Sequence, residues 1–152
     1  MKQLIFIIFI SFVCVNTTNA QVTISCSDLN GTKWQTPEQY DEEAKGFYEY
    51  TLKVMRRHLE NGNTYDHPYY LSDTPTTEFD YSKTGQNTKG CYYVEMMPSI
   101  NQVFCYSIIY FNKTDGKMIL QPIDSPYREI YIMIPSKKPR NQSAGIPVLE
   151  NW

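Results

Sequence analysis

The chain has 152 residues and a formal net charge of −2. Its 14 basic and 16 acidic residues give no electrostatic reason to expect nucleic acid or an anionic membrane surface as a partner. With 41% hydrophobic and 14% aromatic residues, a chain of this length suits one domain with a single core.

The first 20 residues have the parts of a secretory signal peptide. Lys2 supplies the positive charge, residues 4–15 form an apolar run, and Thr18 and Ala20 give the small-residue pattern of a cleavage site. We expect cleavage before Gln21; the alternative is an uncleaved anchor, for which the apolar run is shorter than the roughly 20 residues of a membrane span. The sequence therefore predicts an exported protein, in the periplasm, on the outer surface or secreted, with no transmembrane span in the mature chain.

Turn residues and alternating side chains predict short strands in the first half of the mature chain. Residues 29–35 form a first strand after a glycine turn, and residues 36–45 form a loop or one to two helical turns. From Phe47, aromatic and polar residues alternate, which predicts a strand that continues past a bulge to Glu60. Residues 65–73 form another aromatic strand, in which Pro68 indicates an edge or a break.

The second half carries the clearest strand pattern. Residues 91–97 and 102–111 are both apolar and form a predicted hairpin with its turn centred on Pro98. Asp115-Gly116 is a tight-turn signal before a strand over 117–121. A last strand is expected over 129–134.

Strands in sequential order with short links predict an all-β fold. We expect an antiparallel up-and-down meander that forms a barrel or half-barrel in one domain over residues 21–135. Residues 136–152 are expected to be a C-terminal tail that packs partly on this domain.

The segment Leu29-Asn30-Gly31-Thr32-Lys33-Trp34, followed by alternating strands, resembles the small lipocalin-like domains exported by Bacteroidetes-type bacteria. In that group a Gly and a Trp open the first strand, and Gly31 and Trp34 match those roles, with two residues between them where the motif usually has one. The resemblance implies a lipocalin-like (calycin-type) up-and-down barrel in which Trp34 plugs one end.

Three cysteines follow the signal, namely Cys26, Cys91 and Cys105. If the hairpin turns at Pro98, Cys91 and Cys105 face each other across it, and export would permit a disulfide between them. The alternative is a pair of buried free thiols, because one step of register would separate them.

Catalytic and metal sites have weak support. The two histidines, His58 and His67, lack a recognisable catalytic context, and no set of His, Cys and carboxylate residues has metal-ligand spacing. Glu95 is the most interesting acid, although alternation is expected to point it outward. We therefore predict no catalytic residue, metal or cofactor, and a hydrolase would need His67 or Glu95 beside a pocket.

Tyrosine abundance is the remaining functional signal, with 13 tyrosines in the chain. Tyrosine-rich walls suit a small apolar or aromatic ligand. The leading hypothesis is thus a non-catalytic binding protein of the cell envelope, with the ligand-binding residues Trp34, Tyr48, Tyr50, Tyr92 and Tyr106. The alternative is a surface module with a filled core that binds an envelope protein or glycan.

Overall fold

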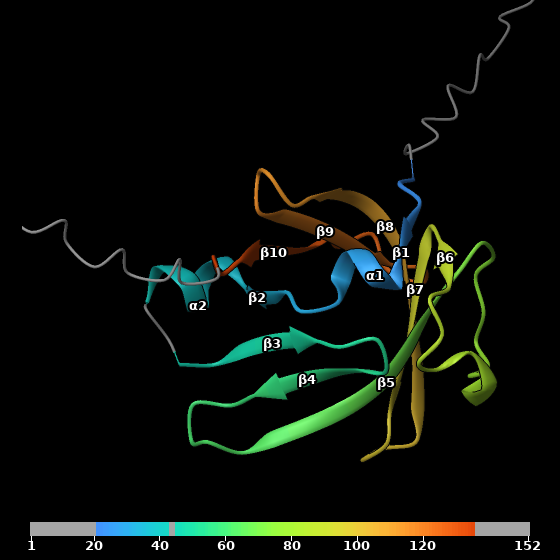
Figure 1. Cartoon of the computed structure of the whole chain (residues 1–152), viewed down its shortest axis with the longest axis horizontal. Coiled ribbons are helices and arrows are strands. Elements are labelled where there is room, and N and C mark those ends of the chain that lie inside the picture. Colours follow the sequence, from blue (N-terminus) through green and yellow to red (C-terminus); the bar gives the residue numbers. More distant parts are fainter. Residues whose placement is uncertain (1–20, 43–44, 136–152) are drawn as a thin grey trace, which may run out of the picture.

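Strands that follow one another along the chain pair with their neighbours and close into an antiparallel barrel (Figure 1). The structure, a computed structural model, describes residues 21–42 and 45–135; the expected signal peptide and C-terminal tail lie outside this part. The barrel strands are β2 (Lys33–Gln35), β3 (Phe47–Tyr50), β4 (Val54–His58), β5 (Thr64–Ser72), β7 (Tyr92–Met97), β8 (Gln102–Asn112), β9 (Lys117–Pro122) and β10 (Glu129–Met133). Their order around the barrel is β10-β2-β3-β4-β5-β7-β8-β9, so the predicted all-β meander is confirmed and the barrel is closed.

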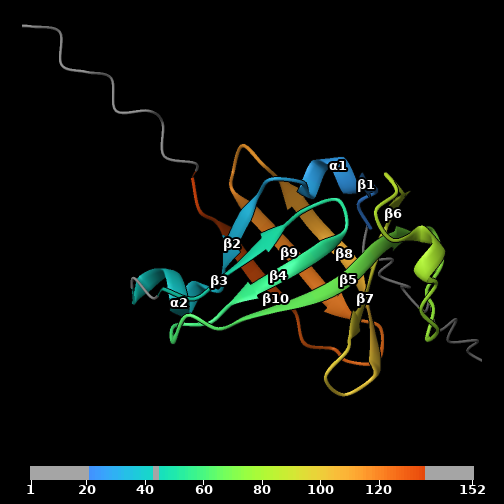
Figure 2. The ribbon, with the colours of Figure 1, turned by 60° about the horizontal axis from the view of Figure 1, so that its bottom comes forward.

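The N-terminal segment covers one end of the barrel. β1 (Ile24–Ser25) pairs with β6 (Lys89–Gly90), and α1 (Cys26–Leu29) follows directly. Ser25 and Asp28 cap α1, because the Asp28 carboxylate accepts from the Ser25 backbone N–H at 2.8 Å. Figure 2 shows α1 at the end of the barrel opposite the β7–β8 turn. We call the end beneath α1 the closed end.

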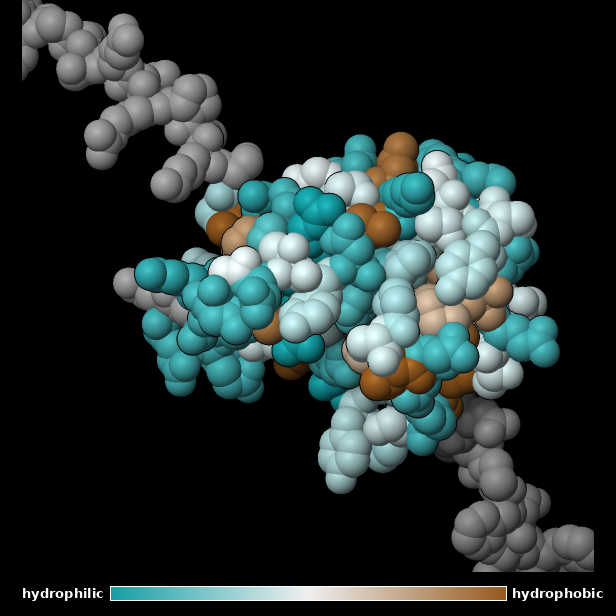
Figure 3. All heavy atoms as spheres, turned by 90° about the horizontal axis from the view of Figure 1, so that it is seen from below, coloured by the Kyte–Doolittle hydropathy of each residue, from teal (hydrophilic) through white to brown (hydrophobic). Residues whose placement is uncertain are grey.

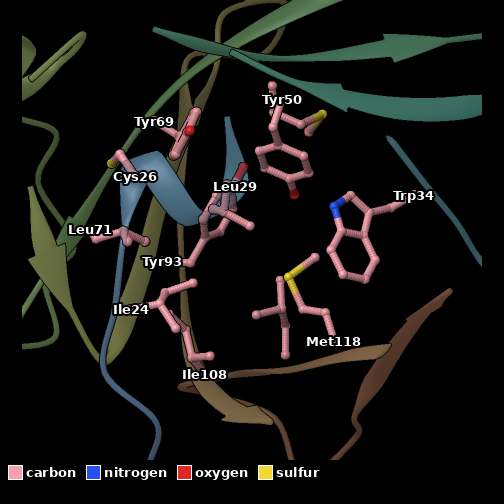
Figure 4. Close-up of a cluster of buried hydrophobic side chains, with 12 residues drawn as sticks. Ile24, Cys26, Leu29, Trp34, Tyr50, Tyr69, Leu71, Tyr93, Ile108 and Met118 are labelled. Atoms are coloured by element: carbon pink, nitrogen blue, oxygen red, sulfur yellow. The ribbon is translucent and has the colours of Figure 1, made fainter. Parts of the chain in front are cut away.

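Buried side chains fill the closed end (Figure 4). Trp34 is fully buried in the same cluster as Leu29, and its indole N–H donates to the Thr32 hydroxyl at 2.7 Å. Gly31 adopts a positive φ of 76°, and its N–H donates to the Tyr50 carbonyl. The glycine turn therefore directs the chain into β2 so that the indole fills the barrel end.

The opposite end carries the helix α2 (Pro37–Asp41) and three connections: residues 59–63, 98–101 and 123–128. The expected helical turn after Thr36 is confirmed, since its hydroxyl accepts from the Gln39 N–H and proline occupies the first helical position. We call this end of the barrel the open end.

The expected long strand over residues 47–60 is instead two strands, β3 and β4, joined by a tight turn. The turn forms because the Thr51 hydroxyl accepts from the backbone N–H groups of Lys53 and Val54. β5 then runs unbroken through Pro68. Pro68 lies opposite Val54 of β4, and the pairing with β7 begins at the next residue, so the proline stands where the strand changes partner.

The β7–β8 hairpin has a different register from the predicted one. Its turn spans residues 98–101, and Cys105 lies opposite Val94 instead of Cys91. The observed and predicted registers differ by three residues. Because this number is odd, each side chain of β7 points to the opposite side of the sheet from the one expected relative to β8. The expected Cys91–Cys105 pairing is not formed, and the three described cysteines are free.

A segment between β5 and β6, which includes a short 3-10 helix (Tyr81–Lys83), covers the outer face of β7. Phe79 from this segment packs with Tyr70, Val94 and Cys105 in a second apolar cluster. This contact explains why β7 is apolar on both faces. None of the described helices is long and apolar enough to cross a membrane.

Candidate functional site

A cavity of about 150 Å³ lies inside the barrel, toward the open end. Aromatic, acidic and basic side chains line it together. The lining residues are Tyr48, Tyr50, Met55, Arg57, His67, Tyr93, Glu95, Met97, Tyr106, Leu120, Glu129 and Tyr131.

Strand alternation explains this lining. Successive side chains of a strand point to opposite faces, so every second residue of a barrel strand points inward, except at the bulge between Ile108 and Tyr110 of β8. On β7 the inward set is Tyr93, Glu95 and Met97, and on β5 it includes His67. The barrel therefore brings residues of separate strands to one small space.

Glu95 is the acid deepest in this space, and only 6% of the residue is exposed. Its Oε2 atom accepts a hydrogen bond of 2.8 Å from the Tyr93 hydroxyl. Burial of a carboxylate is costly unless hydrogen bonds or an opposite charge compensate it. A single tyrosine hydroxyl is modest compensation, so the position of Glu95 calls for a functional explanation.

His67 faces the same carboxylate. Its Nδ1 atom lies 3.7 Å from Oε1 of Glu95, beyond hydrogen-bond distance, and Nδ1 has no hydrogen-bond partner. The residue is 5% exposed. Two buried polar atoms thus face one another across the wall of the cavity without a bond between them.

Tyrosines make up half of the remaining lining residues. Tyr93 lies edge-on to Tyr50, with 6.1 Å between the ring centroids, and tilted against Tyr106 at 5.9 Å. Tyr48 packs edge-on against Tyr131 at 5.5 Å. The contacting rings come from several strands, so each ring helps to hold its neighbours in position along the cavity wall.

The buried tyrosines stay neutral over the physiological pH range. Burial raises the pKa of Tyr50 and Tyr93 well above the usual value near 10, and the negative charge of Glu95 raises both further. Burial likewise raises the pKa of Tyr106 and Tyr131. The walls therefore offer ring faces and hydroxyl groups without charge.

The cavity reaches solvent at the open end. Arg57 is exposed there, with its guanidinium carbon 5.9 Å from the centre of the Tyr48 ring. Glu129 is half-buried and accepts a hydrogen bond of 2.6 Å from the Tyr131 hydroxyl. The mouth thus carries one charge of each sign, and Glu95 adds a negative group below it.

Exposed apolar side chains stand around the open end. They are Tyr40 of α2, Tyr65 near the start of β5, Ile100 in the β7–β8 turn, Ile123 and Tyr127 in the β9–β10 connection, and Ile130 near the start of β10. Figure 3 shows a largely hydrophilic face of the molecule, with hydrophobic residues in separate small groups.

Three of the five residues predicted to bind a ligand line the cavity, namely Tyr48, Tyr50 and Tyr106. Trp34 belongs instead to the core of the closed end. Tyr92 lies on the outer face of β7, against the second apolar cluster, because of the shifted hairpin register.

The sequence prediction for Glu95 was wrong, since the acid points into the barrel and not outward. Tyr93, two residues before Glu95 on the same strand, also points into the barrel. His67 was weighed only as a catalytic candidate. The acid in the middle of an otherwise apolar strand was the signal that singled out Glu95 in the sequence, but its direction was predicted wrongly.

Among the described residues, no three His, Cys, Asp or Glu side chains are grouped to hold an ion. In comparisons with protein-family models, curated proteins and solved structures, no match to this chain was found.

Proposed function

We propose that this protein is a non-catalytic binding protein that holds a small aromatic or apolar ligand in the open end of its barrel. The observation that carries the proposal is the cavity itself, walled by tyrosines from several strands. The alternative of a surface module was expected to have a filled core. The cavity favours the small ligand over that alternative.

The size of the cavity limits the ligand. A volume of about 150 Å³ is that of cavities known to accept one benzene molecule, whereas drug-sized ligands occupy roughly 300–1,000 Å³. The ligand is therefore about one ring in size, or a larger molecule that inserts one ring and leaves the rest outside the mouth of the cavity.

The two tyrosines that were both expected to bind ligand supply a matched test. Tyr106 lines the cavity, while Tyr92 lies on the outer face of the neighbouring strand. We expect Tyr106→Ala to weaken binding of single-ring compounds such as phenol and indole by at least about tenfold, because one wall is lost. Tyr92→Ala should leave the affinity within about twofold in isothermal titration. Equal affinities of both variants and the unaltered protein would refute this site.

A second candidate function is hydrolysis, favoured by the proximity of His67 and Glu95 beside the cavity. A carboxylate and an imidazole at this distance can serve as general base and acid for a bound water. Ester and glycoside substrates of one ring, incubated with the protein and with Glu95→Gln, separate the two candidates. Turnover that disappears in the variant would support hydrolysis; binding without turnover supports the leading proposal.

We further propose that the chain is a lipocalin-like domain and is exported to the cell envelope. The closed eight-stranded meander and the buried Trp34 at one barrel end support the first part. The signal-like composition of residues 1–20 supports the second. Expression of the full chain in a Gram-negative host, followed by fractionation and mass measurement, should find a protein that starts at Gln21 outside the cytoplasm.

A further inference from the structure

We propose that the cavity is selective for a ligand that carries a protonated amine, with Glu95 and His67 as the polar end of the site and the tyrosine rings as its walls. This inference rests on the proposed binding function and assigns the chemical class of the ligand.

The first argument is the unfilled hydrogen-bonding capacity of the pair. Oε1 of Glu95 and Nδ1 of His67 face each other at 3.7 Å, and Nδ1 has no partner. When the imidazole proton is on Nε2, both facing atoms are acceptors. In that state Nδ1 is a buried acceptor without a donor beside the carboxylate oxygen Oε1, and a ligand that reaches both atoms can supply the donor.

The second argument is geometric. A nitrogen placed about 2.8 Å from both atoms can donate to each with a separate N–H, as an ammonium group with three N–H donors can. A hydroxyl has one hydrogen and can donate to only one of the two acceptors. A carboxylate has no hydrogen to donate and would bring a second negative charge beside Glu95.

The third argument is the nature of the walls. Tyr50, Tyr93 and Tyr106 present neutral rings to the cavity, and a cation near an aromatic face is attracted by the ring quadrupole. The same rings accept the apolar part of a ligand of one ring. The site thus combines an anion at its polar end with walls that tolerate positive charge.

The two charged groups at the mouth, Arg57 and Glu129, do not cancel this preference. Arg57 is exposed at the mouth, where water screens its charge, and Glu129 lies at the same end with the opposite sign. His67 is the group that could replace an amine, since a protonated imidazole would itself neutralise Glu95. In that state the cavity would prefer neutral ligands, and the experiment below measures the difference.

Three compounds of nearly equal size test the inference by isothermal titration at neutral pH: benzylamine, benzyl alcohol and benzoate. We expect benzylamine to bind roughly tenfold to a hundredfold more tightly than benzyl alcohol, as hydrogen bonds to a charged group do, and benzoate to bind most weakly. Glu95→Gln should remove the preference for the amine and leave the affinity for the alcohol within about threefold. Glu129→Gln, an equivalent change at the mouth, should retain most of the preference.

The outcomes separate the two proposals. Equal binding of amine and alcohol to the unaltered protein would overturn the amine selectivity and leave the proposed binding function standing. Failure of all three compounds to bind would contradict both. Glu95→Gln is expected to fold, because glutamine has nearly the shape of glutamate and can still accept from the Tyr93 hydroxyl. If Glu95→Gln does not fold, a Glu95→Asp variant provides a second test, since it keeps the negative charge but moves it away from His67. Asp at this position should weaken benzylamine binding more than benzyl alcohol binding, and an unchanged ratio would count against the inference.

Discussion

Oε1 of Glu95 and Nδ1 of His67 lie 3.7 Å apart inside a closed barrel, on strands β7 and β5, and both residues are more than nine-tenths buried. A core built only for stability would place apolar side chains at these positions. Buried polar groups without enough hydrogen bonds or opposite charges lower the stability of the folded state. They are typical of functional sites, where activity is retained at the expense of stability.

The first prediction concerns that cost. Glu95→Gln should raise the free energy of unfolding by about 1 kcal/mol, because a neutral amide loses less hydration on burial than a carboxylate and keeps the Tyr93 hydrogen bond. Urea unfolding followed by circular dichroism measures the change. Glu129→Gln, at the half-buried mouth, should shift stability by less than about 0.5 kcal/mol. A destabilised Glu95→Gln variant would mean that the carboxylate is a net structural support.

The second prediction concerns the pH dependence of stability. Burial raises the pKa of Tyr50 and Tyr93 in the folded state above the usual value near 10. The unfolded chain therefore releases these protons first as pH rises above about 10, and stability, which is fully present below that value, falls above it. Alkaline titration should show tyrosine ionisation, read by ultraviolet absorbance, together with unfolding, read by circular dichroism.

A variant provides the control for the alkaline transition. Tyr50→Phe removes one of the raised groups, so the loss of stability per pH unit above pH 10 should become shallower by up to about 1.4 kcal/mol. Gradual ionisation of all tyrosines while the fold persists would contradict the burial described for these rings.

The third prediction concerns the close approach of β6 to β5. A methyl group at Gly90 would clash with the Ser72 backbone carbonyl, so Gly90→Ala should destabilise the protein by several kcal/mol or prevent folding. Gly62→Ala is the comparison, since Gly62 lies in open space with a φ of 87° and its replacement should cost only about 1 kcal/mol. Thermal unfolding of both variants tests the difference, and similar costs would argue against the described packing of β6.

The fourth prediction concerns the cysteines. Cys91 is half-buried, whereas Cys26 and Cys105 are buried, and the three are unbridged. A thiol reagent should therefore modify Cys91 first in the native protein and all three in denaturant, since reactivity follows exposure. An intact mass two hydrogens lower, with a peptide that links Cys91 to Cys105, would instead establish the disulfide expected from the sequence and contradict the hairpin register.

The sequence predicted the architecture well because strand alternation, turns and short links are local signals. It could not fix which face of β7 points inward, since both faces are apolar: Tyr93 lines the cavity, and Val94 packs beneath Phe79. The direction of the β7 side chains depended on the position of the β7–β8 turn. Because the turn spans residues 98–101 and is not centred on Pro98, Glu95 points into the barrel instead of outward. The Glu95–His67 pair was hidden for the same reason, because it depends on the registers of two strand pairs.

The most direct test of the account is a titration of the tyrosine ring signals by NMR with benzylamine, phenol and indole. The account predicts saturable shifts of the rings that line the cavity, Tyr50, Tyr93 and Tyr106, while Tyr92 on the outer face stays unchanged. Saturation at Tyr92 alone, or no saturable shift at the three interior rings with any of the compounds, would contradict a ligand site inside the barrel.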